Sequence, residues 1–336
     1  MAGGECKVTV VMLTYNQTKY IDEAIKSVMH QKADFDFELL ISDDCSTDDT
    51  LAHCRHWQQQ YGDDRIVILS AEHNSGIQAN YLRAFDACRG EYIAICEGDD
   101  YWIDRSKLQR QVDFLDSHPD YAICVHRVVN YYENDGSKSL SNGGQKAEND
   151  ILDLARSNFI SNVSAMWRRG LFGDSLRQIL DPKKDSVTVD YAIHMLNAQY
   201  GKIHYINRAM AVYRKHNSAV WSQVGADKQY LMAMNVRRAL MAHFKTVRPD
   251  VYALLQDAYV NNAVALVRYY RSNGSDDKIA AVIAEVKNLA PQLSDAEIDK
   301  KINAPMPQQA LRIRAFYVLK SLRKFVSRFV PVPRAK

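Results

Sequence analysis

The feature that most constrains the fold is an alternation of strand and helix patterns over the first 130 residues. Short apolar runs occupy 7–14, 37–42, 65–70, 92–96 and 123–130. Helical patterns separate them at 19–31, 47–61, 77–87 and 107–116. Strands that alternate with helices predict a mostly parallel sheet joined by right-handed crossovers. We therefore expect an α/β fold of the Rossmann-like kind, with helices on the faces of the sheet.

Beyond this alternation the pattern changes twice. Residues 133–149 are polar and Gly-rich and predict a surface loop. Mixed elements follow to about residue 213, including a helix near 191–200 and strands near 203–206 and 210–213. From about residue 226 only helical patterns remain, at 227–245, 250–271, 276–289 and 308–329. We place a domain boundary near 220, with a catalytic domain at 1–220 and an all-helical region at 221–336.

Composition separates the carboxy-terminal tail from the rest. The 336 residues are 47% hydrophobic and 25% charged, as in globular proteins with a proper core. Of 43 basic residues, eight lie in 312–336, which has no acid, so residues 1–311 carry 35 basic against 40 acidic residues. The positive net charge therefore belongs to the tail, which argues against a nucleic-acid-binding surface over the whole chain.

Several classes of protein are disfavoured. No run of 18 apolar residues predicts a membrane-spanning helix, and the first residues lack a secretory pattern. We therefore expect a cytoplasmic chain. All six cysteines lie within the first 124 residues without a C-x-x-C pair or zinc spacing, which predicts reduced and mostly buried thiols.

Polar residues gather where three predicted strands end, the edge at which open α/β sheets bind ligands. The first strand ends in Leu13–Asn16, the second in Asp43–Ser46, and the fourth in Glu97–Trp102. Neither G-x-G-x-x-G nor G-x-x-x-x-G-K-[ST] occurs. This argues against a dinucleotide-dependent dehydrogenase and a P-loop NTPase.

Glu97, Asp99 and Asp100 place three carboxylates within four residues. Such a cluster is tolerable when it meets a cation, and hard oxygen ligands suit Mg²⁺ or Mn²⁺. A solvated acidic turn, with Asp104 capping the next helix, explains the same residues. Gly98, which permits close backbone approach, and the aromatic residues that follow favour the metal site.

The order of these motifs resembles the nucleotide-sugar-binding half of family 2 glycosyltransferases of the GT-A fold. The motifs are TYN, SDDCSTDDT, HNSGIQAN and GEYIAICEGDDYW at residues 14–16, 42–50, 73–80 and 90–102. Residues 189–191, 200–203 and 213–216 resemble the acceptor half of the same family. The resemblance covers roughly residues 7–221, with nucleotide binding in 1–130 and acceptor binding in 150–220.

The resemblance implies nucleotide contacts at the first three loops. Thr14, Tyr15 and Asn16 match the loop under the base and ribose. Asp44 matches the acid that accepts a hydrogen bond from the uracil N3–H, since a carboxylate is an acceptor only.

Neighbouring residues have supporting roles in this resemblance. Asp43 is expected to orient the Asp44 loop, and Asn74 and Asn80 to flank the nucleotide. Helix capping is the alternative for Asp43 and Asp44.

The resemblance also implies a metal site. Asp99 and Asp100 match the second part of the D-x-D motif, where one contacts the ribose or donor sugar and the other holds Mn²⁺ or Mg²⁺ on the diphosphate. Glu97 stands where the motif has its first Asp, which leaves a direct role for Glu97 open. His216 is expected as a further metal ligand or phosphate donor, and Arg214 as a diphosphate contact; a surface basic patch is the alternative for both.

Asp190 matches the acid that opens the acceptor-side helix and is our candidate general base. An inverting transfer needs one carboxylate to deprotonate the acceptor hydroxyl while it attacks the anomeric carbon. The family more commonly has a Glu before this Asp, where Val189 stands here. Asp185 is the second choice, and an N-cap role is the alternative for Asp190.

Acceptor contacts are expected from Trp102, as a platform for sugar stacking, and from Asn162. Trp167 lies in the same stretch as Asn162 and is an equal candidate for an acceptor contact. Trp221 is expected either to close over the sugar or to be an ordinary buried residue.

Residues 311–330 predict a basic amphipathic helix. Leu311, Ala315, Val318, Leu319, Leu322, Phe325, Val326 and Phe329 share one face at 100° per residue. Such a helix binds an anionic membrane surface or packs its apolar face on the preceding helices, and both remain open.

These observations predict an inverting, metal-dependent glycosyltransferase that moves a sugar from a nucleotide-sugar, specifically a UDP-sugar, to a saccharide acceptor. The acceptor is expected to be linked to a lipid such as undecaprenyl diphosphate, in O-antigen, capsule or other polysaccharide synthesis. The alternatives are a catalytically degenerate scaffold and a sugar nucleotidyltransferase. A sugar nucleotidyltransferase is expected to carry a Gly-rich, basic loop after the first strand, and the segment LTYNQTKY at that place is not such a loop. The donor sugar, the linkage and the oligomeric state are not encoded in these patterns.

Overall fold

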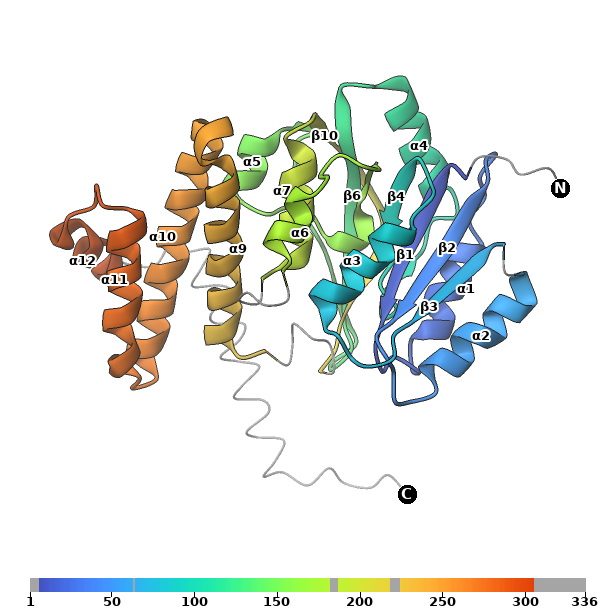
Figure 1. Ribbon diagram of the computed structural model, residues 1–336, viewed down its shortest axis with the longest axis horizontal. Helices are drawn as coiled ribbons and strands as arrows, with labels where there is room; N and C mark the ends of the chain where they lie inside the picture. Colours follow the sequence, from blue (N-terminus) through green and yellow to red (C-terminus); the bar gives the residue numbers. More distant parts are fainter. Residues whose placement is uncertain (1–5, 63, 182–186, 218–223, 305–336) are drawn as a thin grey trace, which may run out of the picture.

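The computed structural model describes residues 6–62, 64–181, 187–217 and 224–304, in which ten strands form one sheet (Figure 1). The strand order is β3-β2-β1-β4-β9-β6-β10-β5, with β7 paired to β6 and β8 to β10. The strands are β1 (Val8–Thr14), β2 (Phe37–Asp43), β3 (Ile66–Ser70), β4 (Tyr92–Ile95), β5 (Tyr101–Trp102), β6 (Tyr121–Tyr132), β7 (Ser137–Leu140), β8 (Glu148–Asn149), β9 (Met166–Arg168) and β10 (Lys202–Lys215).

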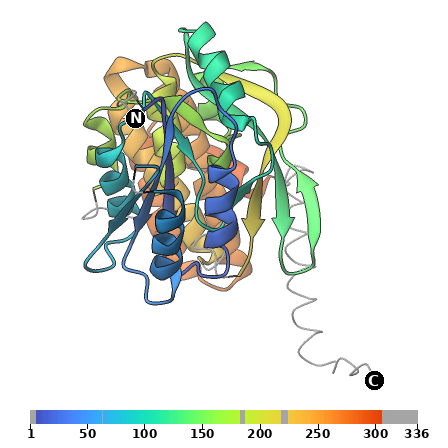
Figure 2. The same ribbon diagram turned by 90° about the vertical axis from the view of Figure 1, so that its right-hand side faces the viewer.

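Helices cover both faces of this sheet and continue beyond it (Figures 1 and 2). The α-helices are α1 (Ile21–Met29), α2 (Thr50–Tyr61), α3 (Ile77–Ala87), α4 (Lys107–Ser117), α5 (Ile151–Arg156), α6 (Ser175–Ile179), α7 (Val189–Ala198), α9 (Ala226–Val247), α10 (Pro249–Ser272), α11 (Ile279–Leu289) and α12 (Asp295–Asn303). Two 3-10 helices, η1 (Asn162–Ser164) and η2 (Asp276–Lys278), complete them. The predicted α/β class is confirmed.

The sheet brings the carboxyl ends of its main strands to one edge. β1 pairs in parallel with β2 and β4, β2 with β3, and β6 with β10. β9 lies between β4 and β6 and is antiparallel to both, so β6 and β10 run in the same direction as β1. The loops after β1, β2, β4 and β10 therefore meet at the lower edge in Figures 1 and 2. This is the edge at which the sequence places its polar residues.

Two hydrophobic cores flank the sheet. One packs α1 and α4 against one face, through side chains such as Ile25 and Leu108. The other contains α3, α5 and α7 and continues without a break into α9 and α10, through side chains such as Tyr191 and Phe244. The helical region is thus attached to the sheet by a shared core. The boundary near 220 falls within residues 218–223, outside the described ranges, and stays a prediction.

Two local predictions were wrong. The polar stretch 133–149 contains β7, which pairs with β6, and β8, which pairs with β10. All four residues of β7 are exposed, so no alternation of apolar and polar residues marks it as a strand. The two strands expected at 203–206 and 210–213 are one long strand, β10, whose pairing with β6 shifts register between them.

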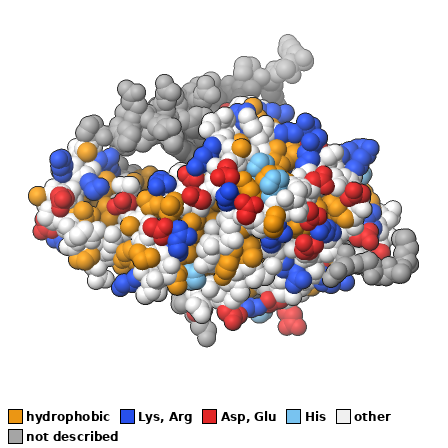
Figure 3. All heavy atoms as spheres, turned by 90° about the horizontal axis from the view of Figure 1, so that it is seen from above, with side chains coloured by type: hydrophobic (Ala, Val, Ile, Leu, Met, Phe, Trp, Pro, Cys, Tyr) orange, Lys and Arg blue, Asp and Glu red, His pale blue; other side chains and the backbone are white. Residues whose placement is uncertain are grey.

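The predicted helices 227–245 and 250–271 are confirmed as α9 and α10. The helix expected at 308–329 lies outside the described residues. Over the face shown in Figure 3, acidic and basic side chains are interspersed among the described residues. That face carries the amino ends of the main strands, opposite to the loops discussed below. None of the described helices combines the length and the apolar character that a membrane span requires.

Candidate active site

The loops after β1 and β2 are tied to each other by hydrogen bonds. The Asn16 backbone N–H donates to Ser46 Oγ at 2.9 Å, and the Thr47 N–H donates to Asn16 Oδ1 at 2.8 Å. Asn16 (φ 54°) and Cys45 (φ 62°) both adopt left-handed backbone conformations. For Cys45 this conformation is costly, and such strain persists only where surrounding contacts hold it.

Beside these loops, Tyr15 is an exposed large side chain, with 42% of the residue accessible to solvent. Thr14 is buried, and its Oγ1 has no hydrogen-bond partner among the described residues. The predicted base-and-ribose loop is therefore a fixed turn with one exposed aromatic ring and one unsatisfied hydroxyl.

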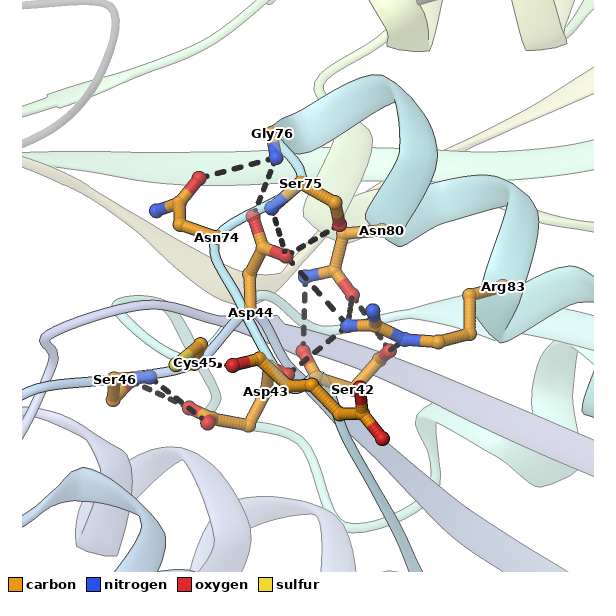
Figure 4. A network of polar contacts seen from close by, with 11 residues as sticks. Ser42, Asp43, Asp44, Cys45, Ser46, Asn74, Ser75, Gly76, Asn80 and Arg83 are labelled. Carbon is orange, nitrogen blue, oxygen red and sulfur yellow. Dashed lines mark hydrogen bonds and ion pairs between the residues drawn. The ribbon is translucent and has the colours of Figure 1, made fainter.

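Asp43 and Asp44 point in different directions from the end of β2 (Figure 4). Asp43 accepts hydrogen bonds from the backbone N–H and the hydroxyl of Ser46. Asp44 accepts from the Ser75 N–H at 3.0 Å, the Ser75 hydroxyl at 2.7 Å and the Gly76 N–H at 2.8 Å. Neither carboxylate caps α2 in this structure. Asp44 instead fixes the loop before α3.

The predicted Asn74 lies in that loop, and its Oδ1 accepts from the Gly76 N–H at 3.1 Å. Asn80 is buried further along α3. Its amide is engaged on both sides, with Ser42 and with Arg83 (Figure 4). Of the two asparagines, Asn74 is thus the one at the surface of the loop, whereas Asn80 supports the end of β2.

Asp100 lies in the turn between β4 and β5 and is 1% exposed. Its Oδ1 accepts the Arg214 backbone N–H at 2.8 Å, which fixes the turn to β10. Its Oδ2 has no hydrogen-bond partner among the described residues. Burial, together with the charges of Asp99 and Glu97, raises the pKa of the Asp100 carboxyl well above its usual range. A buried carboxylate oxygen without a partner is a costly arrangement that a cation would relieve.

Arg214 holds the same turn from the other side. Its Nε donates to the Asp99 carbonyl at 2.8 Å, and its guanidinium forms an ion pair with Glu23. The guanidinium also lies over the Tyr20 and Tyr101 rings, 5.1 Å and 4.5 Å from their centroids. Arg214 is therefore occupied with positioning the turn in this structure, and its predicted contact with a diphosphate stays a prediction.

His216 follows Arg214 on the same strand end. Its Nε2 lies 3.1 Å from Asp99 Oδ2, and its ring lies 4.5 Å from that of Tyr20. The structure thus brings two of the three predicted metal ligands, Asp99 and His216, into direct contact. Asp100 adjoins them through the shared turn.

The residues present fit a metal ion whose coordination is completed by oxygen atoms of the substrate. Among the described residues, no three His, Cys, Asp or Glu side chains form a ready-made metal cage. Mg²⁺ and Mn²⁺ commonly bind through one or two carboxylates together with substrate phosphates. The unsatisfied Oδ2 of Asp100 beside the Asp99 carboxylate matches that mode of binding.

Glu97 accepts its hydrogen bonds from α3 and η1. Its Oε1 accepts from the Tyr81 hydroxyl at 2.9 Å and from Asn162 Nδ2 at 3.2 Å. Burial, with the charge of Asp99, raises the Glu97 pKa to about 7. The predicted acceptor residue Asn162 is thus bound to the carboxylate whose role the sequence left open, while Asn162 Oδ1 has no partner among the described residues.

Asp190 lies in the first turn of α7. Burial raises the pKa of its carboxyl, while the backbone N–H groups of Asp190 and Tyr191 act in the opposite direction. A carboxylate with a raised pKa is a stronger base than one in water. The second candidate base, Asp185, lies outside the described residues.

The acids of this edge share one neighbourhood. The pKa of the half-buried Tyr213 is raised by burial and then by the charges of Asp100, Glu97, Asp99 and Asp190. Asp190 also raises the pKa of Glu97. These effects need proximity, so the predicted base lies in the electrostatic field of the predicted metal ligands.

Two predicted aromatic residues are in the core. Trp102 is 4% exposed, donates from Nε1 to the Val163 carbonyl at 3.3 Å, and has the Lys107 ammonium 4.0 Å from its ring centroid. This burial disfavours Trp102 as a sugar platform, which stays a prediction. Trp167 is fully buried in β9. Trp221 lies outside the described residues.

Three residues of this site, Tyr20, Glu23 and Tyr81, were given no role from the sequence. Tyr20 and Glu23 lie against Arg214, together with Tyr101, and Tyr81 joins Glu97 to Asn162. Glu23 and Arg214 lie 191 positions apart, and no spacing pattern reports such a contact.

Other features lie away from this edge. A cavity of about 310 Å³ is bordered by α3 and residues 169–177 and includes none of the predicted site residues. Among the six cysteines, all are free, and Cys54, Cys88, Cys96 and Cys124 are buried, as predicted.

Comparison with known proteins supports this arrangement. Residues 9–176, which are half of the chain, match the family described as glycosyl transferase family 2. An uncharacterized protein of Mycobacterium tuberculosis is 36% identical over 225 residues, 66% of this chain. That match spans 62% of the relative's own length.

Two further proteins extend the comparison. The dTDP-rhamnosyl transferase RfbG of Shigella flexneri is 27% identical over 260 residues, 75% of this chain and 87% of RfbG. The crystal structure of S. aureus TarS 1-349 with UDP-GlcNAc aligns with a TM-score of 0.56 and 19% identity, over 84% of this chain and 92% of TarS. The TarS likeness concerns the fold and confirms the GT-A architecture. The chain belongs to glycosyl transferase family 2.

Proposed function

We propose that the chain transfers a glycosyl group from a UDP-sugar to a saccharide acceptor, with inversion at the anomeric carbon. The observation that carries the proposal is the Asp99–Asp100 turn, in which a buried carboxylate oxygen lacks a partner, beside a raised-pKa carboxyl at Asp190. A nucleotide diphosphate with its cation would satisfy the first, and an acceptor hydroxyl the second.

The loops after β1, β2 and β3 suit the nucleoside. Tyr15 offers an exposed ring for stacking, and the unsatisfied Thr14 hydroxyl lies beside it. Asp44 fixes the Asn74–Gly76 loop, whose surface would contact the base. The relative RfbG uses a dTDP-sugar by name, and TarS was crystallised with UDP-GlcNAc. Thymine and uracil share the imide edge that an acceptor group reads, so both donors belong in the test.

Asp99, Asp100 and His216 would hold Mn²⁺ or Mg²⁺ at the diphosphate. When bound, the cation neutralises the charge that grows on the nucleoside diphosphate as it leaves. The chain's own groups do the rest. Arg214 keeps Asp99 and Asp100 in place through the Asp99 carbonyl and the Asp100 carboxylate.

Asp190 would accept the proton of the attacking hydroxyl. Partial burial raises the pKa of its carboxyl and with it the basicity, and the start of α7 holds it in place. An inverting displacement needs no nucleophile from the enzyme, because the acceptor oxygen attacks the anomeric carbon directly. This assigns Asp190 a catalytic role and Glu97 a supporting one.

The acceptor and its location are part of the proposal. We place the chain in polysaccharide synthesis, on a lipid-linked acceptor at the inner face of the cell membrane. The support is the basic amphipathic pattern of 311–330, whose structure lies outside the described residues. Deletion of 311–336 should release the protein from anionic liposomes, and a full-length chain that ignores such liposomes at low salt contradicts this part.

The central test measures nucleotide release from a panel of UDP-, dTDP- and GDP-sugars, with Mn²⁺, with Mg²⁺ and with a chelator. We expect turnover with a UDP-sugar that stops when the metal is removed. D190N should lower kcat by at least about a hundredfold, with donor affinity within twofold of wild type. D250N is the matched control, because Asp250 also lies in the first turn of a helix, α10, and pairs with Arg248 away from the site. Turnover that survives in D190N would exclude Asp190 as the base.

A further inference from the structure

Lys107, the first residue of α4, has a fully buried side chain. Lysine is almost never fully buried unless it is paired with an acid. Among the described residues, no acidic side chain forms an ion pair with Lys107. Its Nζ donates to Gln111 Oε1 at 2.8 Å and lies 4.0 Å from the centroid of the Trp102 ring.

This arrangement is not explained by stability. Burial lowers the Lys107 pKa to about 7, which means that the environment disfavours the ammonium. Replacement of a buried charge by an apolar group of similar volume is often neutral or stabilising. The presence of a buried lysine at this position therefore needs a reason other than stability, and we look for it in the contacts of Lys107.

The contacts of Lys107 connect two parts of the candidate site. Trp102 follows Asp100 by two residues, and its N–H groups donate to Ser27 Oγ and to the Val163 carbonyl. Gln111, the hydrogen-bond partner of Lys107, donates to the Ser164 carbonyl at 3.0 Å. Lys107, Trp102 and Gln111 form a buried cluster, and through Trp102 this cluster holds the strand after the Asp99–Asp100 turn.

The other side of the cluster holds η1. Val163 and Ser164 belong to this 3-10 helix, which also carries Asn162, the residue bound to Glu97. Gln111 donates in addition to the Cys124 carbonyl of β6 at 2.7 Å, which anchors the cluster to the sheet. Lys107, Trp102 and Gln111 therefore form a buried link between the turn and η1.

We propose that Lys107 is a positioning residue that fixes the Asp99–Asp100 turn relative to η1, by holding the Trp102 ring from inside the core. A cation over the face of a Trp ring is attracted most strongly where water is excluded. The short segment between Asp100 and Trp102 transmits any shift of the ring to the carboxylates. The inference rests on the proposed function, because it assigns the turn to a metal–nucleotide complex.

The test compares K107M with wild type and with K26M. Methionine removes the ammonium and keeps a long, flexible, apolar side chain. Lys26 is a matched control, because its Nζ lies 4.7 Å from the Trp57 ring centroid on an exposed surface of α1. We measure the Kd for UDP in the presence of Mn²⁺ by calorimetry, kcat and KM for the donor, and the midpoint of urea unfolding.

We expect K107M to unfold at the wild-type urea concentration or above it, to bind UDP with Mn²⁺ about tenfold more weakly, and to show a raised donor KM. K26M should stay within twofold of wild type in each quantity. W102F, which keeps a ring but loses the Nε1 contact with Val163, should lie between wild type and K107M in donor affinity.

Three outcomes would overturn the inference. Donor affinity within twofold of wild type would show that the turn does not depend on Lys107. A parallel loss of stability and affinity, or a K107M chain that fails to fold, would show a general structural role. Wild-type protein that binds no nucleotide with Mn²⁺ would overturn the proposed function and this inference together, whereas normal wild-type binding with unchanged K107M would overturn this inference alone.

Discussion

Two pairs of adjacent aspartates lie at the ends of β2 and β4, on either side of β1, and behave differently. Asp43 is the last residue of β2 and Asp44 follows it, whereas Asp99 and Asp100 lie in the turn after β4. Asp44 and Asp100 are almost equally buried, at 3% and 1% exposure. Both oxygens of Asp44 accept hydrogen bonds, whereas Asp100 Oδ2 accepts none from the described residues. Burial alone therefore does not distinguish them; hydrogen-bond satisfaction does.

This difference separates two roles for the same side chain. A buried carboxylate whose oxygens are satisfied by backbone N–H groups is part of the scaffold, and it gains stability from each bond. A buried carboxylate with a free oxygen costs stability until a ligand completes it. The first pair belongs to the scaffold of the loops after β2 and β3, and a cation at the second pair is part of our proposal.

The largest effect is expected at the unsatisfied pair. In D100N the amide oxygen still accepts the Arg214 N–H, but the charge that attracts a cation is lost. We expect UDP affinity in the presence of Mn²⁺ to fall about a hundredfold. Unfolding in urea without metal should be no easier than in wild type, because a neutral amide is cheaper to bury. Calorimetry and urea titration check both, and a D100N chain that binds UDP with Mn²⁺ normally would break the comparison.

The satisfied pair should respond in the opposite way. D44N places an NH₂ group against backbone N–H donors of Ser75 or Gly76 and removes at least one hydrogen bond. We expect the free energy of unfolding to fall by about 2 kcal/mol. The exposed Asp34 provides the control, since D34N should change it by less than about 0.5 kcal/mol. Equal stability of D44N and wild type would show that Asp44 does not hold the loop.

The smallest effect is a pH dependence at Glu97. Its folded pKa of about 7 lies above its ordinary value of 4.5, so the folded chain keeps a proton that the unfolded chain loses between these pH values. The stability contributed by Glu97 is therefore full below about pH 4.5 and is lost as the pH rises through 7. Gln in E97Q keeps the oxygen that accepts from Tyr81 and Asn162 and does not titrate.

We expect the stability of E97Q relative to wild type to increase between pH 5 and pH 8, by an amount on the order of 2 kcal/mol. Urea titrations of both proteins without metal, at steps of pH, measure this difference. A difference that stays constant with pH would place the Glu97 pKa near its ordinary value.

Much of the fold could be predicted from the sequence. The strands at 7–14, 37–42 and 65–70 follow from continuous apolar runs, and the helices at 227–245 and 250–271 from periodicity. The three-residue β9 and the fully exposed β7 could not be predicted, because neither is long or amphipathic enough to show a period. Both are strands only because a neighbouring strand supplies hydrogen bonds.

The candidate site divides in the same way. The acidic cluster at a strand end pointed to Asp99 and Asp100, and the family resemblance pointed to Asp190 at the start of a helix. It did not show that Arg214 would turn toward Glu23 and Asp99, or that Trp102 would be buried over Lys107. The Arg214 contacts join residues far apart in the chain, and the burial of Trp102 and Lys107 depends on the elements packed around them.

The sequence by itself determined which residues lie at the carboxyl ends of the main strands, because period and apolar content fix where strands stop. Tertiary structure alone decided which carboxylates at that edge are satisfied and which are not. The physical reason is that a carboxylate's state depends on donors brought to it by other elements. Ser75 and Gly76 reach Asp44, and a single N–H from β10 reaches Asp100.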